Sequence, residues 1–282
     1  MTDSSQPIFP PELEEVIFLF ALQDDLKLVG TLVLVAKRVH DWVIPRFYEV
    51  VIFRYASEPH IPHRSLSLQH LAGNGKHVRH LLLHDHSPGR RLDDHFSGCI
   101  DRCPNLCSLG LWIPDNSFTP GLVGGLLRLR LKYLSFDISG LVPALEKQGV
   151  STVLLPTVTH LELIGATKVD PHLVKSYFPA LTHLALTGIG NTPITVLRDA
   201  LDVFGDQLEV AIWYLWNAGD TKTSPRVERT SKYIIVDDPR FVVLRYGANF
   251  ANTWHEGVKG GLGIWKAAEE AVQARRLGTI VL

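Results

Sequence analysis

Apolar and polar positions in the middle of the chain repeat as a six-residue pattern, apolar-x-x-Leu-x-apolar. Five segments fit it: VRHLLL (78–83), LCSLGL (106–111), LKYLSF (131–136), VTHLEL (158–163) and LTHLAL (181–186). Two more, LEVAIW (208–213) and FVVLRY (241–246), look like degenerate copies. Alternation of this kind predicts strands, and successive copies begin 28, 25, 27 and 23 residues apart.

The stretches between these strands predict helices. They are RRLDDHFSGCIDRC (90–103), LVPALEKQG (141–149), DPHLVKSYF (170–178) and ITVLRDALDVFG (194–205). A strand and helix at this period cannot cover their own apolar face, so neighbouring units must stack into a curved solenoid with a parallel sheet. The period favours a leucine-rich-repeat α/β solenoid, and the alternative is an ordinary doubly wound α/β sheet.

The first 50 residues follow a helical period instead. After Pro10 and Pro11, apolar residues recur at helical spacing: Leu13, Val16, Ile17, Phe20 and Ala21. A second helix is expected from Asp24 or Asp25 through Arg38, and a third around HDW (40–42) that Pro45 ends. Three short helices cannot form a deep core alone, so we expect their remaining apolar surface to dock on something else.

These residues resemble an F-box. The similarity lies in the order Phe9-Pro10-Pro11-Glu12-Leu13, Ile17-Phe18, Asp25-Leu26 and Leu34-Val35-Ala36-Lys37-Arg38, followed by HDWVIPRFY (40–48). Together with the repeats, the chain resembles the fungal, basidiomycete-type F-box-like proteins with leucine-rich repeats. Ala36 and Val39 stand where that family usually has Cys and Trp.

The resemblance implies a non-catalytic substrate receptor of a Skp-cullin-F-box type ubiquitin ligase. The N-terminal helices would dock on the Skp-family adaptor, and the repeats would hold a protein target. The expected docking residues are Pro11, Leu13, Ile17, Phe18, Leu26, Leu34, Val35 and Trp42. One alternative is a repeat scaffold without a ligase partner, which the departures at Ala36 and Val39 favour.

The resemblance and the repeats together predict four regions. They are an F-box-like helical module at 7–53, a linker at 54–77, a solenoid at 78–255 with a polar loop at 217–233, and a Gly-rich junction with a C-terminal capping helix at 256–282.

The strand register predicts which side chains share the concave face of the sheet. Residues on either side of each conserved Leu point away from the core, and neighbouring strands lie about 4.8 Å apart, so these residues form ladders. His160 should neighbour His183, with Glu162 close by. The expected partner-binding residues are His80, His84, Trp112, Tyr133, Asp137, His160, Glu162, His183 and Thr187.

Candidate metal ligands crowd one third of the chain: His60, His63, His70, His77, His80, His84, His86 and His95, then Cys99, Cys103 and Cys107. A C-x3-C-x3-C spacing without an evident fourth ligand is not typical of structural zinc, so we expect no metal. AGNGKH (72–77) lacks the phosphate-loop pattern and is expected to be a turn.

The C-terminal segment GVKGGLGIWKAAEEAVQARR (257–276) is expected to be a flexible junction into the capping helix. A nucleotide-binding α/β enzyme that uses these glycines is the other alternative. We expect no cofactor and no catalytic residues.

Charge and composition exclude two partner classes. Lys and Arg number 28 against 29 Asp and Glu, a formal net charge of −1, so no global field concentrates nucleic acid or anionic lipid. The apolar run Val16–Ala36 is broken by Asp24, Asp25 and Lys27, which disfavours a membrane span. Three cysteines and an acidic N-terminus without signal-peptide features lead us to expect a cytoplasmic or nuclear protein.

Overall fold

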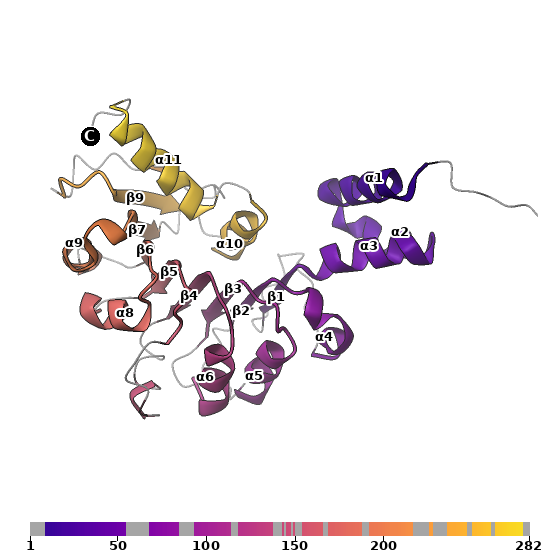
Figure 1. Cartoon of the computed structure of the whole chain (residues 1–282), viewed down its shortest axis with the longest axis horizontal. Helices are drawn as coiled ribbons and strands as arrows, with labels where there is room; N and C mark the ends of the chain where they lie inside the picture. The colour runs from indigo at the N-terminus through magenta and orange to yellow at the C-terminus, as the bar shows by residue number, and fades with distance from the viewer. Residues whose placement is uncertain are drawn as a thin grey trace, which may run out of the picture.

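The computed structural model describes residues 9–54, 68–84, 93–113, 118–137, 143, 145–147, 149, 154–165, 169–187, 192–216, 226–227, 236–246, 250–260 and 263–278. Within these ranges the chain forms an open α/β sheet with a small helical region at its N-terminal edge (Figure 1). The expected α/β class with a parallel sheet is confirmed.

The sheet adds strands in the order in which the chain makes them. Its parallel strands are β1 (Val50–Arg54), β2 (His80–His84), β3 (Ser108–Trp112), β4 (Tyr133–Asp137), β5 (His160–Ile164), β6 (His183–Thr187), β7 (Val210–Trp216) and β9 (Phe241–Tyr246). The short β8 (Arg226–Val227) pairs antiparallel with β9 at the far edge. All seven segments predicted from the apolar pattern contain a strand.

One face of the sheet packs on the helices that connect the strands. These are α4 (Leu68–Asn74), α5 (Asp93–Asp101), α6 (Pro120–Leu127), α8 (Pro171–Tyr177) and α9 (Thr192–Phe204), with 3-10 turns η2 (Gly75–His77) and η4 (Gly205–Gln207). The leucines that recur in the six-residue pattern, such as Leu81, Leu109 and Leu161, are fully buried in this core. The segment AGNGKH (72–77) was expected to be a turn. Its first three residues end α4, and its last three form the 3-10 turn η2.

The opposite face is covered as well. Helices α10 (Phe250–Val258) and α11 (Ile264–Arg276) turn back inside the arc of the sheet (Figure 1). Trp254 of α10 packs with Ile52, Leu82 and Trp112, while α11 buries Ala268 and its neighbours against β6, β7 and β9. The predicted C-terminal helix is confirmed, but it lies across the concave face, where we had expected it to cap the end of the sheet.

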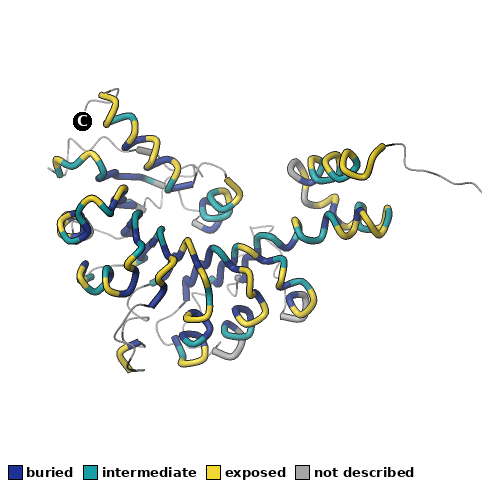
Figure 2. Tube along the Cα trace, in the orientation of Figure 1, coloured by how far each residue is buried: buried dark blue, intermediate teal, exposed yellow. Residues whose placement is uncertain are grey.

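The N-terminal module, residues 11–48, stands beside the first strand. It consists of α1 (Pro11–Asp24), η1 (Leu26–Leu28), α2 (Val29–Leu32) and α3 (Lys37–Tyr48). Its own core contains four buried apolar residues, Leu22, Val29, Val39 and Val43. Arg38 Nε donates to Glu14 Oε2 at 2.8 Å and ties α3 to α1. Figure 2 shows the contrast between this exposed module and the buried strands.

The second and third helices differ from the sequence-based expectation. A helix continuous through Arg38 is wrong, because α2 ends at Leu32 and Lys37 begins α3 after a turn. Gly30 and the β-branched residues around it lower the helix propensity there. Asp25 does act as a cap, since its Oδ1 accepts from the backbone N–H of Lys27 at 2.8 Å.

Pro45 lies inside α3 and does not end it. A proline at this position removes the donor that would reach the carbonyl of Asp41. Asp41 is exposed, so water can hydrogen-bond that carbonyl and the helix continues to Tyr48.

The boundary between module and sheet falls earlier than expected. Residues 50–53 were assigned to the helical module, but they form β1, which pairs in register with β2 from Val50 and His80 onward. The expected linker 54–77 contains α4 and η2, and its residues 55–67 lie outside the described ranges. Most of the expected polar loop 217–233 also lies outside them.

Candidate functional site

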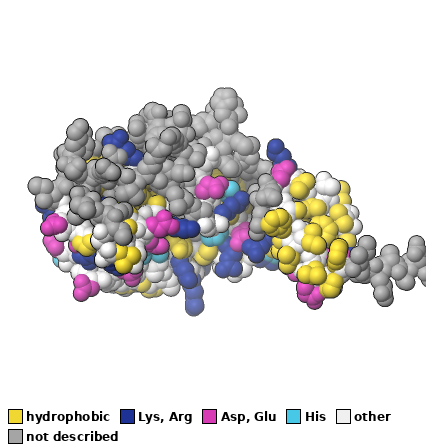
Figure 3. All heavy atoms as spheres, turned by 90° about the horizontal axis from the view of Figure 1, so that it is seen from above, with side chains coloured by type: hydrophobic (Ala, Val, Ile, Leu, Met, Phe, Trp, Pro, Cys, Tyr) yellow, Lys and Arg dark blue, Asp and Glu magenta, His cyan; other side chains and the backbone are white. Residues whose placement is uncertain are grey.

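The most exposed apolar surface of the chain belongs to the N-terminal module. Eleven large apolar side chains are exposed among the described residues, and eight of them fall within residues 9–35: Phe9, Leu13, Val16, Ile17, Phe20, Leu28, Leu34 and Val35. Figure 3 shows hydrophobic side chains gathered over this module. We call these eight residues the apolar face.

Helix α1 supplies half of the apolar face as one stripe. Leu13, Val16, Ile17 and Phe20 lie at i, i+3, i+4 and i+7, and their exposed fractions are 52, 62, 51 and 63%. The opposite stripe, with Leu22 buried and Phe18 and Leu19 half-buried, packs on the module core. The apolar stripe that the sequence predicts for this helix is thus the face of α1 that stays exposed among the described residues.

The turn after α2 extends the apolar face. Leu34 and Val35 are 83% and 57% exposed, and the turn is held by backbone N–H groups of Leu34 and Val35 that donate to Thr31 and Leu32 at 3.1 Å. Two adjacent apolar side chains displayed on a hydrogen-bonded turn expose apolar surface that a monomer would ordinarily bury.

The predicted docking residues divide into three groups. Pro11, Leu13, Ile17, Leu34 and Val35 are exposed and available to a partner. Phe18 and Trp42 are half-buried against the module core. The side chain of Leu26 lies outside the described residues. Sequence reasoning named Val16 and Phe20 as helical positions but missed them as docking candidates, although their period is the same as that of Leu13 and Ile17.

Val39, which stands where the F-box sequences that this module resembles usually have Trp, is a core residue. It is 1% exposed and packs with Val43, and Trp42 contacts the same cluster from the surface side. This departure from the F-box pattern therefore lies in the interior of the module and not among the eight residues of the apolar face.

The concave ladders form in the expected register. Strand pairing sets His80, Ser108, Tyr133, His160 and His183 in one row. Their expected exposure is wrong for the residues beneath α10 and α11. Trp112, Glu162, His183 and Thr187 are buried; His80, His84, Asp137 and His160 are partly buried; Tyr133 is exposed.

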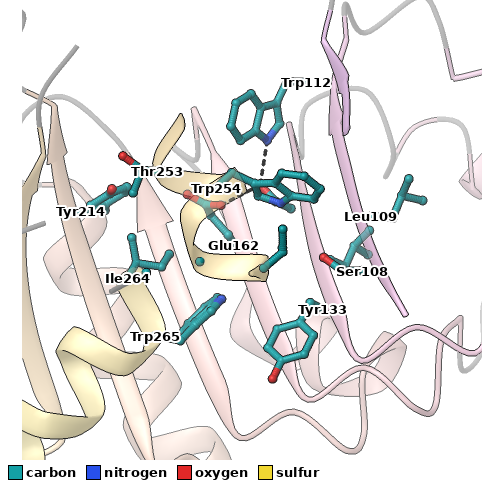
Figure 4. Close-up of a pocket in the computed structure, with 15 residues that line it drawn as sticks. Ser108, Leu109, Trp112, Tyr133, Glu162, Tyr214, Thr253, Trp254, Ile264 and Trp265 are labelled. Atoms are coloured by element: carbon teal, nitrogen blue, oxygen red, sulfur yellow. Dashed lines mark hydrogen bonds between the residues drawn. The ribbon is translucent and has the colours of Figure 1, made fainter. Parts of the chain in front are cut away.

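A chain of polar contacts runs through this covered face (Figure 4). Trp112 Nε1 donates to Ser135 Oγ at 2.8 Å, and Ser135 Oγ donates to Glu162 Oε2 at 2.7 Å. Thr187 Oγ1 donates to Glu162 Oε1 at 3.5 Å. The hollow between these residues and Trp254 measures about 50 Å³. That is far below the volume of a typical ligand pocket, so the contacts form a polar core under α10.

Burial raises the pKa of Glu162 to about 7, although hydrogen bonds from Ser135 and Thr187 favour the carboxylate. An uncompensated buried charge is costly, which accounts for the direction of the shift. Glu162 therefore titrates near neutral pH inside the protein.

His160 and His183 stack with ring centroids 4.1 Å apart, and their Nε2 atoms lie 3.9 and 3.3 Å from Glu269 Oε1 on α11. Their Nδ1 atoms face the hydroxyls of Thr159 and Thr182 at 2.9 and 2.8 Å. Burial lowers the pKa of His160 to about 3 and also lowers that of His183, so both rings are neutral at pH 7. The expected pairing of His160 with His183 is confirmed. The carboxylate nearest their Nε2 atoms is that of Glu269.

These three side chains are the one group of possible metal ligands found close together among the described residues. The two rings are stacked with planes that differ by only 13°, so in-plane lone pairs on their Nε2 atoms lie in nearly parallel planes and do not converge on one ion. The geometry suits a clamp between α11 and strands β5 and β6 better than a metal centre.

The other candidate ligands divide by position. Cys99 and Cys103 are free and buried, and burial raises the pKa of each thiol to about 12. His60, His63 and His86, with the side chains of His70 and His95, lie outside the described residues.

The C-terminal glycines have a packing explanation. A Cβ on Gly263 would lie 2.6 Å from the Cα of Gly257, so only glycine lets the end of α10 meet the start of α11 this closely. Gly260 adopts φ +80°, a left-handed conformation. Gly257 and Gly263 therefore have a packing role where the two helices meet.

Comparison with known proteins adds no relative: no protein-family model matches the chain, and no curated protein is similar to it. Within the described ranges, no helix combines the length and apolar character needed to cross a bilayer.

Proposed function

We propose that this chain is a substrate-recognition subunit of a Skp-cullin-F-box type ubiquitin ligase. The N-terminal module docks on the Skp-family adaptor, and the body of the protein holds a target. The chain performs no bond chemistry in this role. It raises the effective concentration of target lysines near the conjugating enzyme.

The apolar face is the observation that carries this proposal. The module has eight exposed large apolar side chains and a core of only four buried ones. It therefore exposes much apolar surface to water, which is unfavourable in free energy. Burying a side chain such as Ile17 in a partner contributes about 1.5 to 3 kcal/mol. A protein partner is the natural cover for such a surface.

The F-box identity of the module and the leucine-rich-repeat identity of the sheet are part of the proposal. The sequence resemblance supports the first. Sequential parallel strands with connecting helices on one face support the second. Such a receptor works in the cytoplasm or nucleus, where the adaptor is found.

Isothermal titration of the full chain with purified Skp-family adaptor tests the docking step. We expect saturable binding that weakens at least about tenfold in Ile17→Asp, because a charge enters the centre of the apolar face. Leu277→Asp is the matched control, since Leu277 is 67% exposed at the other end of the chain. It should bind like the unaltered protein.

Circular dichroism must first establish that both variants fold. An unaltered chain that does not bind the adaptor, or equal affinities for Ile17→Asp and Leu277→Asp, would contradict the proposal.

A further inference from the structure

A wide groove runs along the amino-terminal edge of strands β1 to β4. Its walls come from four segments that each lead into a strand: the end of α3 (45–49), the turn before β2 (76–79), the turn before β3 (104–107) and the turn before β4 (128–132). Strands in a parallel sheet all begin at one edge, so these segments lie side by side. The groove encloses about 930 Å³ and is open to solvent.

Positive charge dominates this groove. Its lining contains six basic side chains, Arg46, Lys76, Arg79, Arg128, Arg130 and Lys132, against one acidic side chain, Glu49. The whole chain carries a formal net charge of −1, so this accumulation is local.

Four of the six cations make no ion pair with any described residue. Arg46 pairs with Glu49 at 3.1 Å and Arg128 pairs with Asp101, whereas Lys76, Arg79, Arg130 and Lys132 are exposed and have no acidic partner in the described part of the chain. Unpaired cations in one hollow repel each other, and an anionic ligand would relieve that repulsion.

Hydrogen bonds hold the backbone of three of these segments in place. The N–H of Cys107 donates to the carbonyl of Arg79 at 2.8 Å, and the N–H of Lys132 donates to the carbonyl of Cys107 at 2.9 Å. Asn105 Nδ2 donates to the carbonyl of Lys76 at 2.7 Å. Arg79 and Lys132 therefore stand two strands apart, about 10 Å at the usual strand spacing. Alternate side chains of an extended peptide repeat about every 6.8 Å, so two or three anionic groups fit along the groove.

The lining favours a peptide over a nucleic acid. Among the described residues that line it there is no Phe, Tyr or Trp on which bases could stack, and base stacking is a main source of affinity for single strands. Pro45 and Pro104 are at least partly exposed and offer small apolar contacts suited to a polypeptide. Arginines bind carboxylates and phosphates through paired N–H donors.

We infer that this groove binds an extended anionic segment of a protein partner, through carboxylates or phosphates that pair with Lys76, Arg79, Arg130 and Lys132. The segment would belong to the target, so this inference rests on the proposed receptor role for the partner's identity. Peptide binding itself needs no adaptor. The groove also replaces the concave face as the target surface, since α10 and α11 cover the latter.

Fluorescence anisotropy with the purified full chain tests the inference. The probes are a labelled octaglutamate peptide, a serine-rich peptide with two phosphoserines, the octaglutamine peptide, and single-stranded RNA and duplex DNA of similar charge. We expect saturable binding of one or both anionic peptides that weakens with added salt, no binding of octaglutamine, and weaker binding of the nucleic acids.

Three variants locate the binding. The double variant Arg130→Glu with Lys132→Glu should lose at least about tenfold in affinity, since two ion pairs become repulsions. The control, Arg198→Glu with Lys259→Glu, makes the same charge change at exposed positions outside the groove and should stay within about twofold. Glu49→Gln should bind more tightly than the unaltered chain, a gain that misfolding cannot produce.

Absence of saturable binding by both anionic peptides would overturn the inference. So would equal losses in the groove variant and the control, or tighter binding of either nucleic acid than of the peptides. The groove variant leaves the apolar face intact, so it should still bind the adaptor. Peptide binding therefore tests the groove, and adaptor binding tests the proposed ligase role.

Discussion

The N-terminal module and the concave face of the sheet both carry apolar surface, but only one of them is covered by the chain itself. On the concave face, α10 and α11 bury Trp112, Ile212 and Val242. On the module, Leu13, Ile17 and Leu34 stay exposed. The difference shows that the inner face of the sheet is a second core, whereas the module keeps apolar surface exposed, which is why we propose the module as the docking region.

A charge introduced on α11, which packs on the concave face, should destabilise the fold far more than a charge introduced on the apolar face of α1. Ala268 is fully buried on the concave side, so Ala268→Asp puts a carboxylate into an apolar cluster. We expect a loss of about 3 to 5 kcal/mol in the free energy of unfolding, measured by urea denaturation. A loss below about 1 kcal/mol would mean that α11 does not pack on the sheet in solution.

The polar core under α10 gives a pH-dependent prediction. The folded state raises the pKa of Glu162 from 4.5 to about 7, so it holds a proton that the unfolded state releases between these values. The contribution of Glu162 to the free energy of unfolding is fully present below about pH 4.5 and is lost as the pH rises through 7. Glu162→Gln stays neutral, so its melting temperature relative to the unaltered chain should rise by roughly 2 to 3 °C between pH 6 and pH 8.5. A difference that does not change with pH would show that Glu162 is solvated.

The matching change on the module should have the smallest effect on stability. Ile17 is 51% exposed, so Ile17→Asp removes little buried area. We expect the free energy of unfolding to change by less than about 0.5 kcal/mol under the same urea conditions. A loss comparable to that of Ala268→Asp would place Ile17 in a core and remove the contrast between the two regions.

The sequence predicts the strands well because their signal is local. In VTHLEL the alternation of Leu161 and Leu163 with polar neighbours is enough to set both strand and register. β1 was missed because VVIF (50–53) also fits the end of a helical module, and only its pairing with β2 decides between the two.

The covering of the concave face was missed because α10 and α11 are distant in sequence from β3 to β5. A signal exists nonetheless. In VAIWYLW and FVVLRY nearly every position is apolar, which is typical of strands buried on both faces. The residues Ala251, Trp254 and Val258 lie at i, i+3 and i+7, the spacing of a helix that packs along one side.

The apolar face was predicted in part, because helical periodicity locates an apolar stripe but does not reveal which stripe of α1 stays exposed. In α1 the stripe of Leu13 and Ile17 is the open one, and the weaker stripe of Phe18 and Leu22 makes the internal core. The basic groove could not be predicted from the sequence. Its charges come from four segments that are far apart in the chain and that only the parallel sheet brings together.

Hydrogen–deuterium exchange of the full chain, with and without purified Skp-family adaptor, tests the central claim most directly. We predict that the adaptor slows exchange in peptides covering residues 11–35 and leaves those covering β5, β6 and α11 unchanged. Unchanged exchange throughout residues 11–35 in the presence of saturating adaptor, or protection confined to the sheet, would contradict the assignment of the apolar face as the docking surface.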